Sequence, residues 1–144
     1  MKPSQKIIRH QLRLSPDDDT QFLGIVTAEP DYKLSLTINK TLGISLRNID
    51  PVEITDESGT LRHFSRFAAV SAHDISYSLI SNRSETEILI KKLPRIDYFF
   101  RVYSDEEEIE FESITSVLRA IASITAVFIL TRKEIKDKNL EYLA

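Results

Sequence analysis

Short stretches of apolar residues, either alternating with polar ones or running continuously, predict strands along most of the chain. The alternation is clear over residues 6–14, where Ile8, Leu12 and Leu14 fall at even positions among polar neighbours. A continuous apolar run at residues 126–130 is typical of a strand in the interior of a sheet. Further strands are predicted at residues 22–26, 61–70, 75–81 and 96–103.

Turn-forming residues indicate how some of these strands connect. Residues 56–59 (DESG) are a turn signal, and residues 72–74 (AHD) can join the two strands that flank them as a hairpin. The pattern over residues 44–54 is mixed, with a bend predicted at Asp50-Pro51. A meander of neighbouring strands is the simplest arrangement for residues 61–81.

Residues 30–42 fit two patterns at once. Their apolar residues alternate as in a strand, but Leu34, Ile38 and Leu42 also lie on one face of a helix. Gly43 follows directly and can adopt the left-handed conformation that ends a helix. We therefore predict a helix over residues 30–42.

A second helix is predicted after Ser104. A serine can cap the first turn of a helix, and acidic residues are favoured there, as at residues 105–108. Beyond them, apolar residues recur at helical spacing at Ile114, Val117, Leu118 and Ile121. In the polar tail after residue 132, the residues that could pack against a core are Ile135, Leu140, Tyr142 and Leu143.

The chain has the size and balance of one globular domain over residues 1–144, with 42% hydrophobic and 28% charged residues. We predict an α+β fold with one largely antiparallel sheet and two main helices. The chain ends in a strand, a helix and a strand, an order that implies a right-handed crossover joining two parallel strands. By analogy of fold alone, this ending resembles half of a ferredoxin-like unit.

The composition assigns no catalytic, cofactor-binding or metal-binding residue. The chain has no cysteine, which excludes thiolate metal sites and cysteine nucleophiles. Three glycines in the whole chain leave no glycine-rich phosphate loop. His10, His63 and His73 are not paired at the spacing of metal ligands, and residues 17–19 (DDD) lack the glycine and glutamate of a calcium loop.

The net charge of −3 and the pI near 5.6 weigh against a nucleic-acid partner. Arginines and aromatic residues do interleave at residues 62–67 (RHFSRF), and an exposed strand face of this kind could stack bases. Packing of one face in the core explains the same pattern and is favoured. No stretch resembles a signal peptide or a membrane span, so we expect a cytoplasmic protein without membrane contact.

Asp97 is an acidic residue inside an apolar stretch. An unpaired buried carboxylate is costly, so this side chain must face solvent or have a partner. It could serve as a structural hydrogen-bond anchor or as a residue of a pocket. The anchor is favoured, because a carboxylate without a partner histidine or a second acid has little catalytic reach.

The segment 88–102, ILIKKLPRIDYFFRV, resembles the signature of the IPExxxVDY family, a bacterial family whose function is unassigned. Ile90 takes the first position of that signature and Ile96-Asp97-Tyr98 the closing triplet, while lysines 91 and 92 replace its proline and glutamate. Asn82 ends a further similar stretch just before it. The resemblance therefore singles out Asp97, Tyr98 and Asn82 as candidate interaction residues or structural anchors, and it implies no activity.

Several hypotheses of function follow. The first is a small non-enzymatic protein-interaction module with a protein partner, itself or another, as in a homodimer through a sheet edge or the C-terminal tail. The second is a regulatory domain that binds a small molecule, ACT-like by fold analogy only. An enzyme built on Asp97 and Tyr98 with His73 or Asn82, or an RNA-binding protein, has less support. No cofactor is expected.

Overall fold

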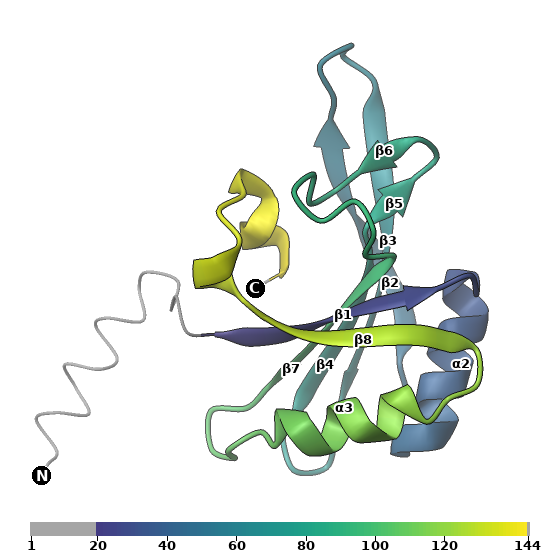
Figure 1. Cartoon of the computed structure of the whole chain (residues 1–144), viewed down its shortest axis with the longest axis vertical. Helices are drawn as coiled ribbons and strands as arrows, with labels where there is room; N and C mark the ends of the chain where they lie inside the picture. The colour runs from purple at the N-terminus through teal and green to yellow at the C-terminus, as the bar shows by residue number, and fades with distance from the viewer. Residues whose placement is uncertain (1–19, 144) are drawn as a thin grey trace, which may run out of the picture.

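The computed structural model describes residues 20–143, which form a six-stranded antiparallel sheet in the order β2-β3-β4-β7-β1-β8 (Figure 1). The strand predicted at residues 6–14, His10 and the acidic residues 17–19 lie outside the described residues. The described strands of this sheet are β1 Gln21–Thr27, β2 Arg47–Thr55, β3 Leu61–Val70, β4 Ser76–Ser81, β7 Tyr98–Tyr103 and β8 Ile124–Thr131. The described helices are α2 Asp31–Leu42, α3 Phe111–Arg119 and the short 3-10 helices η1 Arg132–Glu134 and η2 Lys138–Leu143. A small hairpin, β5 Arg83–Ser84 and β6 Glu87–Ile88, forms a separate two-stranded sheet. The predicted α+β class is confirmed.

Every second strand of this antiparallel sheet runs parallel, and two of these parallel pairs are relevant to the fold. β7 and β8 are both antiparallel to β1, so they run parallel to each other, as predicted for the C-terminal strand–helix–strand unit. In the same way, β1 and β4 are both antiparallel to β7. The order β4-β7-β1-β8 with α2 and α3 is that of a β-α-β-β-α-β ferredoxin-like chain. β2 and β3 are inserted between α2 and β4 and extend this sheet on one side.

The sheet has a core on each face. On one face, Leu34 and Ile38 of α2 and Leu118 of α3 pack against sheet residues that include Leu23 and Phe100. The other face is covered by the segment between β4 and β7 and by the C-terminal 3-10 helices, which lie together above the sheet in Figure 1. There the buried residues include Leu89, Ile90, Ile135, Leu140 and Leu143, together with Phe22, Phe64 and Phe99 from the sheet.

The helix predicted at residues 30–42 is present as α2, and its end follows the predicted motif. Gly43 has a φ of 67°, in the left-handed region. The backbone amides of Gly43 and Ile44 both donate to the carbonyl of Asn39, at 2.8 and 3.1 Å. Glycine ends the helix here because a side chain would strain this conformation.

The second helix begins later than predicted. α3 starts at Phe111, and residues 105–110 are not helical, so the acidic run is not its first turn. The Ser104 hydroxyl instead accepts bonds from the amides of Glu106 and Glu107 at 3.2 and 2.9 Å, which closes a local turn. Ile109 and Phe111 both pack against the core. In a helix these two side chains would point about 200° apart, so a helix starting at residue 105 could not bury both.

Two predicted strands also differ from the structure. Asp97 precedes β7 and is not inside it. The apolar run at residues 126–130 belongs to β8, which is the outermost strand of the sheet and not an interior one. Its apolar residues serve both faces, because Val127 and Ile129 pack against the core under the helices while Leu130 packs against the opposite core.

Candidate functional site

Asn82 is completely buried and holds the returning segment 83–97 through its side-chain amide. Its Nδ2 donates to the carbonyls of Leu93 and Ile96, at 2.9 and 2.8 Å. Its Oδ1 accepts a bond of 2.7 Å from the amide of Ile90. Both N–H groups and the oxygen of the Asn82 side chain are therefore hydrogen-bonded, and this buried polar residue leaves no group unpaired.

Asp97 ties the same segment to the end of β1. Its Oδ2 accepts a bond from the amide of Thr27 at 2.9 Å, and its Oδ1 accepts one from Nε of Arg83 at 2.7 Å. Nη2 of Arg83 donates in turn to the carbonyl of Pro94 at 2.6 Å. The carboxylate therefore joins three parts of the chain that are far apart in sequence.

Tyr98 makes a similar connection one residue later. Its hydroxyl donates to the carbonyl of Glu29 at 2.8 Å, between β1 and α2. Burial raises the pKa of Tyr98 to about 12, with smaller contributions from the carboxylates of Asp31, Asp97 and Glu29. The phenol therefore stays protonated at neutral pH and acts as a hydrogen-bond donor.

Asp97 and Tyr98 line an open cleft of about 320 Å³ where the end of β1, the start of α2 and the end of β4 meet. Its lining residues are Thr27, Ala28, Glu29, Pro30, Ser81, Arg83, Asp97 and Tyr98. None of the histidines in the described part of the chain lies in this cleft. His73 is in the turn between β3 and β4, and Asn82 is buried beneath the segment 83–97, so the four residues considered for an enzyme do not form one site.

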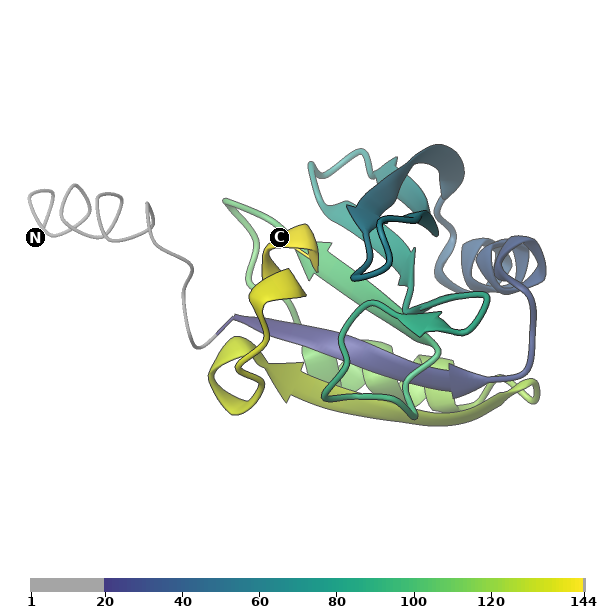
Figure 2. The same cartoon turned by 90° about the horizontal axis from the view of Figure 1, so that it is seen from above.

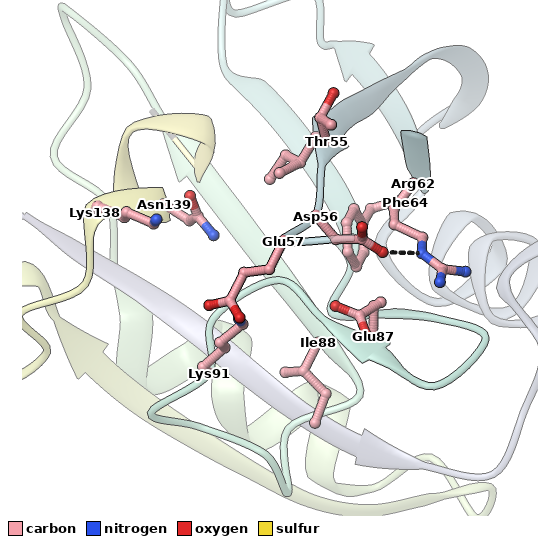
Figure 3. Close-up of a pocket in the computed structure, with 11 residues that line it drawn as sticks. Thr55, Asp56, Glu57, Arg62, Phe64, Glu87, Ile88, Lys91, Lys138 and Asn139 are labelled. Carbon is pink, nitrogen blue, oxygen red and sulfur yellow. Dashed lines mark hydrogen bonds and ion pairs between the residues drawn. The ribbon is translucent and has the colours of Figure 1, made fainter. Parts of the chain in front are cut away.

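A second, smaller depression of about 70 Å³ lies between the end of β2, β6 and η2 (Figure 3). Asp56 and Arg62 form an ion pair of 2.8 Å on its wall, and Arg62 also pairs with Glu85 at 2.6 Å. Hydrogen bonds from the Ser58 hydroxyl, from Arg62 and from the Thr60 amide lower the pKa of Asp56 well below its usual range. These contacts close the turn between β2 and β3. The turn predicted at residues 56–59 is present, and Asp56 is the residue that accepts its hydrogen bonds.

The strand with interleaved arginines and aromatic residues does not present an exposed stacking face. Phe64 and Phe67 of β3 point to opposite faces of the sheet, and each is buried in a different core, with 2% and 7% exposure. Arg62 is engaged with the carboxylates described above. The favoured interpretation was packing of one face in the core, and the structure goes further, because both faces of this strand contribute a buried phenylalanine.

The two edges of the sheet differ in chemistry. The β2 edge, RNIDPVEIT, carries Arg47, Asp50, Pro51 and Glu53, and its pairing with β3 shifts register between Ile49 and Val52. Charges, a proline and a bulge are the devices by which sheet edges avoid pairing with other chains. The β8 edge, ITAVFILT, has no charged residue and no proline, and it lies along the outside of β1 in Figure 2.

The backbone of β8 presents hydrogen-bonding groups away from β1. The carbonyl of Val127 accepts two bonds from Arg119 of α3, from Nη2 at 2.7 Å and from Nε at 3.2 Å, and the amide of Thr131 donates to Glu134 at 3.1 Å. Because backbone groups alternate in direction along a strand, the amide and the carbonyl of Ile129 face the same outer side. No strand pairs with this side of β8 within residues 20–143. Phe128, between these residues, is 47% exposed.

This edge is the feature that the sequence did not indicate. The composition of residues 126–130 is that of an interior strand, and only the strand order places it outside. The fold thus defines the class of protein, an α+β domain with ferredoxin-like strand order and an inserted hairpin. Comparisons with protein-family models, curated proteins and solved structures find no match to this chain. None of the described helices is long and apolar enough to span a membrane.

Proposed function

We propose that this chain is a small non-enzymatic protein-interaction module that binds by adding a strand of its partner to the β8 edge. The observation that carries the proposal is the chemistry of β8: eight residues without charge or proline, whose outer side carries the backbone groups of Ile129. Unpaired strand edges are templates for pairing with another chain, and main-chain bonds supply the affinity in such complexes. Phe128 adds an exposed apolar side chain at the centre of this strand.

The contrast between the two edges supports this proposal. The β2 edge is protected by charge, proline and a bulge, as expected for a sheet that avoids association. The β8 edge is covered at two points only, by Arg119 and Glu134, among the contacts of the described residues. Because the β2 edge is protected against pairing and the β8 strand is uncharged, a partner strand is expected at the β8 edge.

The alternative function, a regulatory domain that binds a small molecule, has less support. The cleft beside Asp97 is where such a ligand would bind. The polar groups of Asp97 and Tyr98 are engaged with the backbone of Thr27 and Glu29, where they hold the segment 83–97 against β1. A ligand would have to displace these bonds. We therefore propose a structural role for the two residues that carry the resemblance to the IPExxxVDY signature, and a cytoplasmic location, which the cysteine-free sequence supports.

The proposal is tested by an affinity pull-down of the tagged full-length protein from a lysate of its native host, read by quantitative mass spectrometry. Phe128→Lys places a charge on the β8 edge. Leu61→Lys is the matched control, because Leu61 is similarly exposed, 50% against 47%, and lies on β3. We expect one partner that is captured by the native protein and the control and lost with Phe128→Lys.

Two other results would count against this function. A partner that Phe128→Lys still captures would place the contact surface elsewhere. A partner lost with Asp97→Ala, but kept by Phe128→Lys in a folded protein, would move the contact to the cleft. Circular dichroism of each variant shows whether it is folded.

A further inference from the structure

We infer that the strand that pairs with β8 is β8 of a second copy of this chain, antiparallel, with Phe128 opposite Phe128 of the second copy. The inference rests on the proposed function, since it names the partner of the same edge. A strand paired with its own copy about a two-fold axis uses the same surface twice and closes the assembly at two chains. The result is one continuous sheet across both molecules.

The charge pattern favours a copy of β8 over other strands of the molecule. Like charges directly opposite one another destabilise a strand pair. Two copies of Ile124–Thr131 place no charged strand residues opposite one another, because the strand has none; a nearby charge is that of Arg119 of α3, which is bonded to the Val127 carbonyl. Two copies of β2 would align strands that carry Arg47, Asp50 and Glu53, and the bulge would disrupt their pairing.

The direction of the backbone groups sets the register. Ile25, the residue of β1 opposite Val127, accepts a bond at its carbonyl from the amide of Asp97 on the β7 side. Ile25 therefore turns away from β8, and Val127 points its own amide and carbonyl outward. With the two-fold axis at Phe128, Val127 of each copy lies opposite Ile129 of the other. Each of these two residue pairs exchanges two backbone hydrogen bonds, one in each direction. A carbonyl has two lone pairs, so Val127 can accept from Ile129 of the second copy if it keeps the shorter bond from Nη2 of Arg119, at 2.7 Å, and gives up the longer one from Nε, at 3.2 Å.

This register also accounts for the exposure of Phe128. At the axis the two residues form a pair without backbone bonds between them, in which the Cα atoms lie about 4.5 Å apart and the side chains are closest. Opposite residues in an antiparallel pair point to the same face of the sheet. The two rings would then contact across the axis as an aromatic pair, and the ring that is 47% exposed in one chain would become covered.

The first test measures self-association of the full-length protein by analytical ultracentrifugation over a wide range of concentration. We expect a monomer–dimer equilibrium in the native protein and in Leu61→Lys. Phe128→Lys puts two lysines directly opposite each other across the axis, so we expect its dimer to be weaker by a factor of about ten or more. A dimer that is equally strong in Phe128→Lys would overturn the inference.

The second test reads the register directly. Because the chain has no cysteine, a single introduced cysteine forms a disulfide only between two chains. Phe128→Cys should cross-link readily under mild oxidation, since paired Cα atoms about 4.5 Å apart are within disulfide range. Thr125→Cys, also exposed, is the control. The two copies of residue 125 would lie about 20 Å apart along the strands and should not cross-link.

The outcomes separate this inference from the proposed function. If the native protein stays monomeric at all concentrations, or if Thr125→Cys cross-links as well as Phe128→Cys, pairing of β8 with its own copy is wrong. In that case a different protein lost with Phe128→Lys in the pull-down would leave the interaction module standing with another partner. If neither self-association nor a Phe128-dependent partner is found, both proposals fail.

Discussion

The carboxylate of Asp97 accepts a hydrogen bond of 2.9 Å from the backbone amide of Thr27, a residue 70 positions earlier in the chain. The bond fixes the approach to β7 against the end of β1, at the point where the chain turns toward α2. It is the contact on which the structural interpretation of Asp97 depends, and it leads to the first of four predictions.

Replacing Asp97 with alanine leaves the amide of Thr27 without its acceptor. A buried donor that loses a charged acceptor costs about 2 kcal/mol, whereas the partly exposed pair with Arg83 adds little. We therefore expect the free energy of unfolding from urea titration to fall by about 2 kcal/mol. Asp97→Asn keeps an acceptor and should lose less, and Glu108→Ala, an exposed acid, should lose nothing measurable. Equal losses for Asp97→Ala and Asp97→Asn would contradict the role assigned to the Thr27 contact.

Asn82→Ala should be more damaging than Asp97→Ala. It leaves one amide and two carbonyls of the segment 83–97 without partners in a fully buried position, so we expect a loss of about 3 kcal/mol or more. Hydrogen exchange at the amide of Ile90 should accelerate more than exchange in β3. Asn82→Asp should not rescue stability, because a carboxylate cannot donate to the carbonyls of Leu93 and Ile96. A stable Asp variant with a slowly exchanging Ile90 amide would refute this prediction.

Tyr98 predicts a dependence of stability on alkaline pH. Its pKa is raised from 10.0 to about 12 in the folded chain. A raised pKa means that the phenol contributes its full stability below pH 10, and that this contribution is lost as the pH rises through 12. The free energy of unfolding of the native protein should therefore fall more steeply between pH 10 and 12 than that of Tyr98→Phe. Parallel pH profiles of the two proteins would contradict the raised pKa.

Gly24 and Ile96 should show a coupled response to substitution. A Cβ on Gly24 would lie 2.9 Å from Cδ1 of Ile96 and 2.9 Å from Cδ1 of Leu130. Overpacking of this kind costs about 1 kcal/mol when flexible side-chain ends can shift. Ile96→Val removes one of the two atoms, so Gly24→Ala should cost less in that background by about 0.5 kcal/mol. A double-mutant cycle from urea titrations measures the difference, and strict additivity would show that Ile96 does not restrict residue 24.

Much of the local structure could be predicted because single residues determine it. Gly43 decides between helix and strand for α2, and the two turn signals around residues 61–70 delimit β3. The tail residues Ile135, Leu140 and Leu143 are buried, as their isolation among polar neighbours suggested. In each case the cause lies within a few residues of its effect.

The arrangement of distant parts could not be predicted in this way. The sequence around Asp97 predicted that its carboxylate faces solvent or has a partner, but neither Thr27 nor Arg83 could be identified without the fold. The three partners of Asn82 are backbone groups, which every residue carries, so no sequence pattern marks them. An edge strand that buries both faces has the same composition as an interior one. The sequence therefore predicted an interior position for β8, and the strand order shows that this prediction was wrong.

The strand order also sets an order of assembly. β1 is the first described strand to be synthesised, yet it lies between β7 and β8, the last two, with Leu23 paired to both Phe100 and Ile129. Contacts between strands near in sequence form faster than contacts between distant ones, so we expect β2, β3 and β4 to associate early as a local meander. β1 cannot complete its ladder until β8 has emerged from the ribosome. Its apolar residues stay uncovered until then, so a strand that has neighbours on both sides in the folded sheet is among the last to be closed in.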